Sequence, residues 1–367
     1  MENRIKFLKA NGAAVDIIYF SKNIAKSHYY LDLDNMTIGL PHMKNFVVLN
    51  MILYFLPFSI ARRSIMPSDL KKIKEILRSR TYDYCLVESQ RSYFAWSQLE
   101  SRINAHVIYL RVHNIESLYY FSLFKSAVKT LRYFEIISCL LESILYTIKE
   151  FFVLSKNTHY KLAFISSNEI ISSANSCLMP YIPFPQSSTL RFEEIDHVTQ
   201  INIVYTGNLM VSDNQDYIDM LINASARFKP TVNIHIHVVG RAPSELLKLS
   251  IKNITFYGLL PSKEMLKILN KSRFALNIAG NSQGIKTKFF EYLSYRLLVI
   301  SNQNGLSGIT TSPHIFPVVN SEFDIVETIT HLIESSASYK ALLSNQQTFY
   351  SNYISDAISK NLTLFSL

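Results

Sequence analysis

Residues 201–337 alternate between short β-branched segments and segments of helical periodicity, and this alternation limits the possible folds more than any other feature. The predicted strands cover residues 201–206, 233–239, 254–257, 274–279, 297–301 and 316–319. Helices are predicted between them, over residues 216–228 and 244–250 and from residues 262, 286 and 322. Short buried strands separated by helices are typical of a parallel sheet covered on both faces. Ligands bind such sheets beyond the carboxyl ends of the strands, where Gly207, Gly240 and Gly258 lie here.

The first half shows a similar but less regular alternation. Its predicted strands cover residues 15–20, 82–87, 105–111 and 162–166, with helices over 68–80, 92–103 and much of 116–155. Pro180, Pro183 and Pro185 then predict an extended linker, because proline suits neither a helix interior nor a central strand. We therefore predict an α/β protein with two Rossmann-like, doubly wound domains and a cleft between them. The predicted boundaries are 1–180, a linker over 181–200, a second domain over 201–337, and a helical tail over 338–367.

The positive charge lies almost wholly in the first half. The 367 residues carry a net charge of +9, and residues 1–180 hold 22 basic and 14 acidic side chains. Cys85, Cys139 and Cys177 are too scattered for a disulfide framework or a metal cluster, which favours a reducing compartment. The longest apolar run, Phe46–Ile60, is shorter than a bilayer crossing requires, and no secretory signal precedes it. The sequence thus predicts a cytoplasmic protein.

The stretch Ala275–Ile300 (ALNIAGNSQGIKTKFFEYLSYRLLVI) carries the clearest chemistry. A predicted strand ends in a glycine-bearing loop, and a helix then opens with Lys286 and Lys288. Amides at a helix N-terminus beside two ammonium groups form a natural diphosphate site. Glu291, one turn into that helix, can accept hydrogen bonds from both ribose hydroxyls. The combination predicts binding of a nucleotide diphosphate.

This stretch resembles the C-terminal domain of retaining glycosyltransferases with the two-domain GT-B fold, the group 1 or family 4 class. Further segments match that class in order: VYTGNL (Val204–Leu209), HVVGR (His237–Arg241), NITFYGLLPSKEM (Asn253–Met265), NGLSGI (Asn304–Ile309) and, in the first half, RVHNIE (Arg111–Glu116). The resemblance covers most of residues 105–330. It implies a cytoplasmic enzyme that takes a nucleotide diphosphate sugar and needs no metal or other cofactor. The resemblance assigns no residue as a nucleophile.

The resemblance assigns roles to individual residues. Glu291 corresponds to the second glutamate of the family's E-x7-E motif and would bind the ribose, while His113 would line the sugar pocket. Position 283, where the first glutamate is expected, is Gln283, which hydrogen-bonds but supplies no negative charge. The predicted catalytic residues are thus His113 and Gln283. The predicted donor-binding residues are Gly207, Asn208, Arg241, Gly258, Gly284, Ile285, Lys286, Lys288 and Glu291.

Two other departures from the family pattern bear on function. The loop after Gly207 contains no cation, so neutralisation of the diphosphate would fall to Lys286, Lys288 and Arg241. The family opens with a strand and a glycine-rich loop, whereas this chain opens with a predicted helix over Asn3–Ala10, followed by what corresponds to the second strand. Either the expected opening strand is missing, or Met1 is not the original start of the chain.

Simpler structural interpretations stand beside these roles. Lys286, Lys288 and Glu291 would also suit a solvated first helical turn, His113 a structural position, and Arg241 a helix-end cation. His235 and His237 alternate along a strand and are interpreted as packing residues. The segment Gly280–Thr287 lacks the glycine–lysine step of a P-loop. Asp32 and Asp34 resemble a metal-binding DxD triplet but are interpreted as a solvated loop.

The segment Phe46–Arg80 joins an apolar, aromatic run to seven basic and two acidic residues. It predicts a docking face for an anionic membrane, with the protein peripheral on the inner side. A buried helix followed by a solvated one is the alternative interpretation. No nucleic-acid-binding motif accompanies the charge.

The predicted function is transfer of a sugar, with retention, from a nucleotide diphosphate sugar to a glycan or lipid-linked acceptor in O-antigen or capsule synthesis. Two alternatives stay open. One is a catalytically weak binding or scaffold protein of the same fold. The other is a sugar-nucleotide epimerase, although the histidine and acidic residues of such enzymes are not evident here.

Overall fold

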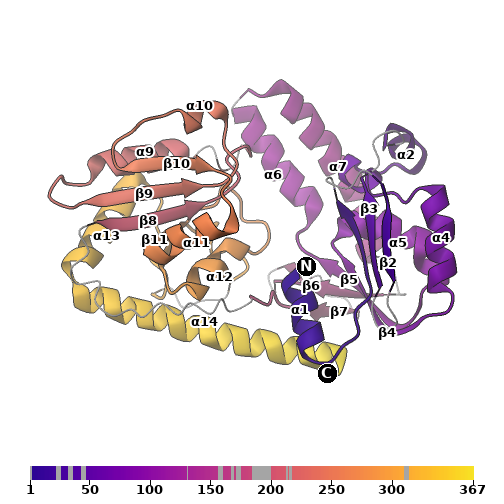
Figure 1. The fold of residues 1–367 in the computed structure, drawn as a ribbon. Coiled ribbons are helices and arrows are strands. Elements are labelled where there is room, and N and C mark those ends of the chain that lie inside the picture. The colour runs from indigo at the N-terminus through magenta and orange to yellow at the C-terminus, as the bar shows by residue number, and fades with distance from the viewer. Residues whose placement is uncertain are drawn as a thin grey trace. The chain divides into compact units, whose positions relative to one another are not determined.

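The computed structural model describes residues 2–21, 26–31, 36–42, 47–129, 131–155, 160–166, 169–170, 175–183, 200–211, 214, 217–309 and 314–367 (Figure 1). Asp32, Asp34, Phe46 and most of the predicted linker, residues 184–199, lie outside these ranges. The chain divides into two compact units. Unit 1 comprises Met1–Lys125, Arg132–Ile182 and Ala357–Leu367, and unit 2 comprises Ser126–Leu131 and Pro183–Asp356.

The described residues of unit 2 form a five-stranded parallel sheet of order β10-β9-β8-β11-β12. Its strands are β8 (Ile201–Thr206), β9 (Ile234–Val239), β10 (Ile254–Gly258), β11 (Ser272–Asn277) and β12 (Leu298–Ser301). The strands are rich in Ile, Val and Phe because both faces of the sheet are covered. Strands 201–206 and 234–239 match the prediction almost residue for residue. The predicted strand over 316–319 is reduced to one bridge between Val318 and Ser301.

Helices cover both faces of this sheet. They are α9 (Ile218–Arg227), α10 (Ser244–Leu247), α11 (Ser262–Lys271), α12 (Thr287–Ser294) and α13 (Glu322–Glu334). Figure 1 shows α11 and α12 in front of the sheet and α9 and α13 behind it. Ile218 and Leu221 of α9 pack with Ile325 and Ile329 of α13 in the core cluster that also holds the strand side chains. The doubly wound arrangement predicted for residues 201–337 is confirmed.

Unit 1 holds two sheets among its described residues. One is parallel, of order β4-β5-β6-β7: β4 (Thr81–Glu88), β5 (Asn104–Val112), β6 (Lys161–Phe164) and β7 (Ser176–Leu178). The other has the order β1-β3-β2: β1 (Ile17–Ser21), β2 (His28–Leu31) and β3 (Met36–Pro41), with β2 antiparallel to β3.

The two sheets of unit 1 are linked by side chains rather than by a shared ladder. The Asp16 carboxylate, just before β1, accepts hydrogen bonds from Arg80 Nη1 and from the Tyr82 hydroxyl at the start of β4, each 2.8 Å long. The Rossmann-like domain predicted for this half thus has its described strands in two sheets. Among the described strands, none pairs with both β1 and β4, so the two sheets stay separate.

The helices of unit 1 are α1 (Glu2–Ala10), α2 (Val47–Tyr54), α3 (Phe58–Ala61), α4 (Pro67–Leu77), α5 (Tyr93–Leu99), α6 (Glu116–Lys129) and α7 (Tyr133–Ser155), with short 3-10 turns at Gln90–Ser92 and Glu100–Arg102. The last residues of α6 are assigned to unit 2. No helix in the described part of the chain combines the length and apolarity needed to cross a membrane.

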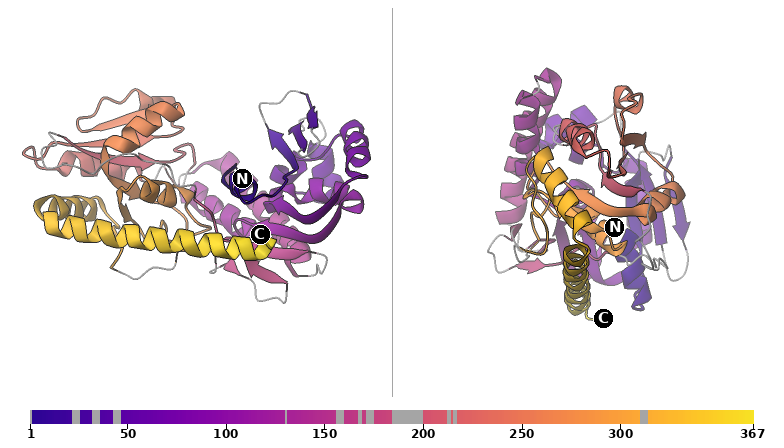
Figure 2. Two further views of the ribbon diagram at one scale, coloured as in Figure 1. Left: turned by 60° about the horizontal axis from the view of Figure 1, so that its bottom comes forward. Right: turned by 90° about the vertical axis from the view of Figure 1, so that its left-hand side faces the viewer.

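The predicted tail is α14 (Ser336–Phe365), a continuous helix whose residues belong to both units (Figure 2). In unit 2 the Gln346 amide pairs with the backbone N–H and C=O of Val299. In unit 1 the Phe365 ring contacts Tyr84 and Tyr109, and Arg4 Nη1 donates to Asn361. The helix therefore contributes to both cores rather than forming a separate tail.

Candidate active site

The order of the sheet in unit 2 reverses between β8 and β11. From β8 the chain proceeds outward to β9 and β10, then returns to add β11 and β12 on the other side. At such a switch point the loops after the two neighbouring strands run in opposite directions and leave a crevice. The loops in question follow Thr206 and Asn277, so the site predicted over residues 275–300 lies at this crevice.

Lys288 connects the two strand ends. Its ammonium donates one hydrogen bond to the carbonyl of Thr206 and another to the carbonyl of Ile278, each 3.0 Å long. Nζ also lies 4.3 Å from the centre of the Tyr205 ring. A lysine ammonium has three donor hydrogens, so one is left for a ligand at the crevice.

Tyr292, four residues along α12, holds the same strand end from the other side. Its hydroxyl accepts a hydrogen bond from the backbone N–H of Thr206 and lies 2.7 Å from the Thr206 hydroxyl. Side chains at positions i and i+4 lie on one helix face, which explains how both reach Thr206. The motifs did not reveal Tyr292 because a buried tyrosine there suits packing equally well.

The electrostatics of Lys288 are unusual for a lysine. Desolvation, with a smaller effect from the charge of Lys286, lowers its pKa to about 7. The protein offers dipoles but, among the described contacts of this side chain, no carboxylate. An anion entering the crevice would supply the missing negative charge and raise that pKa.

The loop before α12 holds Lys286 differently. Its ammonium donates to Asn281 Oδ1 at 3.0 Å and to the carbonyl of Gln283. Gly284 has φ +65°, a conformation that favours glycine, and Ile285 and Lys286 then lead into α12. No side chain caps the start of α12, so its first amides are available to a ligand.

A second loop fixes the shape of this one. Asn302 Oδ1 accepts from the amides of Ala279 and Gly305, and Asn302 Nδ2 donates to the Ala279 carbonyl. Asn304 Nδ2 donates to the Gly280 carbonyl, and the Ser307 hydroxyl donates to the Ser282 carbonyl. The segment NGLSGI, matched only by resemblance, thus braces the loop after β11. Asn302 was missed as a site residue, although its position directly after a buried strand was a usable signal.

The loops after β8 and β9 approach closely at Gly207 and Gly240. A Cβ on Gly240, which has φ +141°, would lie 1.8 Å from the Gly207 carbonyl oxygen. The Gly207 amide donates to Val239, and the Gly240 amide donates to Gly258 at the end of β10. Only glycine at position 240 permits this approach, which holds three strand ends together.

Arg241 and Asn208 lie beside this contact. Arg241 is exposed, and the described structure gives its guanidinium no hydrogen-bond or ion-pair partner. Asn208 Oδ1 accepts from the Met210 amide in a turn. Arg241 is therefore a cation free to meet an anion.

Glu291 lies on α12, three residues after Lys288. Its residue surface is exposed, and no donor to its carboxylate is found among the described residues. Desolvation by the surrounding protein raises its pKa. The side chain of Gln283 is likewise without a described partner. Both keep their hydrogen-bonding capacity for a ligand.

His113 belongs to unit 1, directly after β5. Its Nε2 lies 2.9 Å from Oε2 of Glu88, at the end of β4, and the imidazole stays partly exposed. Burial lowers the pKa of His113 despite this contact, which favours the neutral form of the ring. Glu88 was not singled out from the sequence, because a glutamate at a strand end carries no motif.

His235 and His237 behave as predicted. His237 contacts the Tyr257 hydroxyl at 2.8 Å and Asn202 Oδ1 at 2.9 Å, and His235 Nε2 lies 2.9 Å from the Thr255 hydroxyl. Both are packing residues along β9. Among the described residues, no group of three or more His, Cys, Asp and Glu side chains could hold a metal ion.

Sequence comparison identifies the domain that carries this crevice. Residues 200–335 match the profile of the family described as "Glycosyl transferases group 1". This unit is a group 1 glycosyltransferase domain. A protein of Klebsiella pneumoniae, described as an uncharacterized 44.6 kDa protein in the cps region, is 25% identical over 338 residues, which cover 84% of this chain and 79% of that protein.

Solved structures extend the similarity beyond the glycosyltransferase domain. A trehalose-6-phosphate synthase matches with a TM-score of 0.61 at 12% identity, over 99% of this chain and 95% of its own. The sucrose-phosphate synthase of Thermosynechococcus elongatus matches with a TM-score of 0.62 at 13% identity, over 98% of this chain and 90% of its own. HepE of Anabaena, in complex with UDP and glucose, matches with a TM-score of 0.57 at 11% identity, over 90% of this chain and 85% of its own. The chain therefore has the GT-B fold.

Proposed function

We propose that this chain transfers a sugar from a nucleotide diphosphate sugar to a lipid-linked glycan, with retention at the anomeric carbon. The observation that carries the proposal is the set of polar groups at the switch point of the sheet in the glycosyltransferase domain. Lys288 has one unused donor hydrogen there, the first amides of α12 have no side-chain cap, and Glu291 has an uncommitted carboxylate. The amides and Lys288 suit a diphosphate, and Glu291 suits a ribose diol.

The reaction breaks the bond between the anomeric carbon and the β-phosphate oxygen. The acceptor hydroxyl forms the new bond on the same face, and its proton passes to the departing phosphate oxygen. Negative charge grows on that oxygen as the bond breaks. Lys288 and the α12 amides would stabilise it, which is the usual way a fixed polar site accelerates a reaction. Gln283 and His113 would orient sugar hydroxyls.

A catalytically weak sugar-nucleotide-binding protein is the second candidate. Gln283 in place of the family's glutamate is the observation that favours it, because an amide supplies no negative charge to an oxocarbenium-like centre. Binding would survive this change while transfer slowed.

The acceptor is proposed from context. The Klebsiella relative comes from a cps region, which supports synthesis of capsule polysaccharide, with O-antigen as the related possibility. The predicted membrane face has structural support: α2 exposes Ile52 and Leu53, and α4 exposes Lys71 and Lys72. These residues would let the protein dock peripherally on an anionic membrane at the cytoplasmic side, where a lipid-linked acceptor lies.

Incubation of the purified chain with UDP-, GDP- and dTDP-sugars, with and without a lipid extract, tests the enzyme. We expect one donor to be consumed, the product to keep the donor's anomeric configuration by NMR, and Lys288→Met to abolish consumption. Binding of a donor without hydrolysis or transfer under any of these conditions would favour the weak binding protein. An inverted product would contradict retention.

The lowered pKa of Lys288 predicts pH-dependent binding. Above pH 7 the free protein has lost the Lys288 proton, whereas the complex retains it, so binding takes up a proton. Affinity for a nucleoside diphosphate should then fall up to about tenfold per pH unit above 7, until the pKa of the bound state is reached. Calorimetry in buffers of different ionisation enthalpy measures the uptake. Uptake that persists in Lys288→Met would contradict this assignment.

A further inference from the structure

Helix α7 exposes apolar side chains along its length. Phe134, Ile137, Leu141, Ile144, Ile148 and Phe151 follow one another at alternating spacings of three and four residues, which places them on one face. Phe134 is 86% exposed and Ile137 is 70% exposed. Over residues 133–152, where the structure describes the side chains of α7, the exposed residues are all uncharged: Tyr133, Phe134, Ile137, Ser138, Leu140, Leu141, Ile144, Thr147, Ile148, Phe151 and Phe152.

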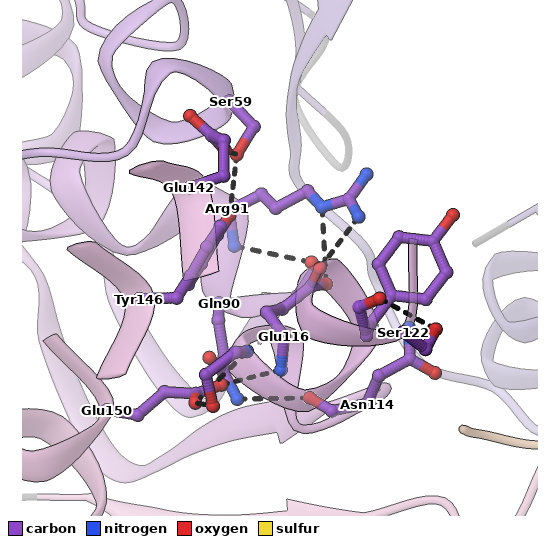
Figure 3. A network of polar contacts seen from close by, with 12 residues as sticks. Ser59, Gln90, Arg91, Asn114, Glu116, Ser122, Glu142, Tyr146 and Glu150 are labelled. Carbon is purple, nitrogen blue, oxygen red and sulfur yellow. Dashed lines mark hydrogen bonds and ion pairs between the residues drawn. The ribbon is translucent and has the colours of Figure 1, made fainter. Parts of the chain in front are cut away.

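Two of the three acidic side chains of α7, Glu142 and Glu150, are buried and contact neighbouring helices, as Figure 3 shows. Glu150 accepts hydrogen bonds from the amides of Glu116 and Ser117 at the start of α6. Glu142 accepts from the Phe58 amide and the Ser59 hydroxyl at the start of α3. The helix is thus inverted relative to a helix that covers a core: it buries carboxylates and presents its apolar face outward.

Buried contacts fix this orientation. Tyr146 stacks on Tyr120 of α6 and packs with Val47, Leu56 and Ile60 around α2 and α3. Turning α7 to hide its apolar face would strip the α6 and α3 amides of their carboxylate partners. The exposed face is therefore a built feature of unit 1, and a large exposed apolar face marks an interaction site.

The charges beside this face indicate what covers it. Lys125 of α6 lies 4.7 Å from the centre of the Phe121 ring, and Arg62 lies 5.8 Å from that of Phe58, an exposed ring next to α2. Arg132 precedes the helix and Lys149 lies within it. Glu135, the partly exposed acid of α7, is paired with Arg132. Aromatic residues at both ends of the helix and basic side chains beside it suit an anionic bilayer. A second copy would bring like charges together.

We infer that α7 lies flat in the headgroup region of an anionic bilayer, with its apolar face immersed. At about 1.5 Å per residue the helix offers a contact roughly 34 Å long. The exposed apolar side chains of α2, which packs on α7 through Tyr146, extend this contact. The inference deepens the membrane docking proposed above for Phe46–Arg80, and it is independent of whether sugar transfer occurs.

Vesicle flotation of the full chain tests the inference. The triple variant Ile137→Ser/Ile144→Ser/Ile148→Ser removes apolar groups from the exposed face only, so far-UV circular dichroism and nucleoside diphosphate affinity should not change. We expect wild type to float with phosphatidylcholine–phosphatidylglycerol vesicles, and the variant to bind them at least about tenfold more weakly. The matched variant Lys71→Gln/Lys72→Gln should lose part of the dependence on anionic lipid and keep the apolar contribution.

Three outcomes would overturn the inference. The triple variant could bind vesicles as wild type does, which would leave docking to α4. Wild type could fail to float both with phosphatidylcholine–phosphatidylglycerol vesicles and with vesicles of phosphatidylcholine alone. Sedimentation velocity could show a wild-type dimer that the triple variant converts to monomer, which would assign the face to a second copy. Loss of nucleotide binding would instead count against the proposed function. Failure of the membrane inference and failure of the proposed function are therefore distinguishable.

Discussion

Replacing Lys288 with methionine is expected to weaken binding of a nucleoside diphosphate roughly 10- to 100-fold, because a hydrogen bond to a charged group contributes about 1.5–3 kcal/mol. Methionine keeps the length and apolar stem of the side chain but has no donor. The third hydrogen of the Lys288 ammonium is the one assigned to the phosphate, since the other two bond to Thr206 and Ile278. Calorimetric titration measures the change.

Lys267→Ala is the matched control. Lys267 is exposed on α11 in the same unit, so its loss removes one positive charge away from the crevice. Equal losses of affinity in the two variants would mean that net charge, rather than the position of Lys288, binds the ligand. An unchanged affinity in Lys288→Met would contradict the placement of the diphosphate.

Replacing Glu88 with alanine is expected to lower the free energy of unfolding of unit 1 by about 3–5 kcal/mol. Glu88 contacts Arg111 at 2.8 Å, His113 at 2.9 Å and Arg4 at 3.3 Å, and both arginines are buried. Removing the carboxylate leaves these guanidiniums buried without their carboxylate partner. Trp96, the single tryptophan, lies in a core cluster of this unit, so its fluorescence during denaturation reports the loss.

Glu75→Ala is the control for this prediction, because Glu75 is exposed on α4 and its loss should change stability little. The pH dependence gives a second check. Burial alone would raise the pKa of Glu88, but the His113 hydrogen bond and the charges of Arg111 and Arg4 hold it well below its usual range. Its contribution should be complete above the ordinary glutamate pKa and disappear as the solution is acidified. Stability of Glu88→Ala equal to that of Glu75→Ala would refute the role.

The sequence predicted unit 2 well because its strands are buried on both faces. Runs such as INIVYT and NIHIHVV are apolar and β-branched, and glycines or helix-opening residues mark where they stop. Lys288, Glu291 and Gly207 were placed by these strand ends, and the structure brings all three to the loops and helix around the switch point. Sequence order alone could not show that Lys288 donates to the Thr206 carbonyl, because the two residues are 82 positions apart.

Unit 1 was harder to predict for physical reasons. β2 and β3 contain only four and six residues, so periodicity alone does not separate them from loop. The apolar pattern of α7 indicates a helix but not which face is buried. The buried face is set by hydrogen bonds that Glu142 and Glu150 accept from amides of α3 and α6, which are distant in sequence. Long-range polar contacts, rather than local propensity, thus decide which face of α7 is buried.

Titration of the full chain with UDP, GDP and dTDP, repeated on Glu291→Ala and with pyrophosphate as ligand, tests the central claim most directly. The crevice is predicted to bind at least one nucleoside diphosphate at a single site for which pyrophosphate competes. Glu291→Ala should weaken the nucleotide about tenfold or more, by loss of the ribose hydrogen bonds, and leave pyrophosphate unchanged. No binding of any nucleotide, or an equal affinity of wild type and Glu291→Ala for the nucleotide, would contradict the account.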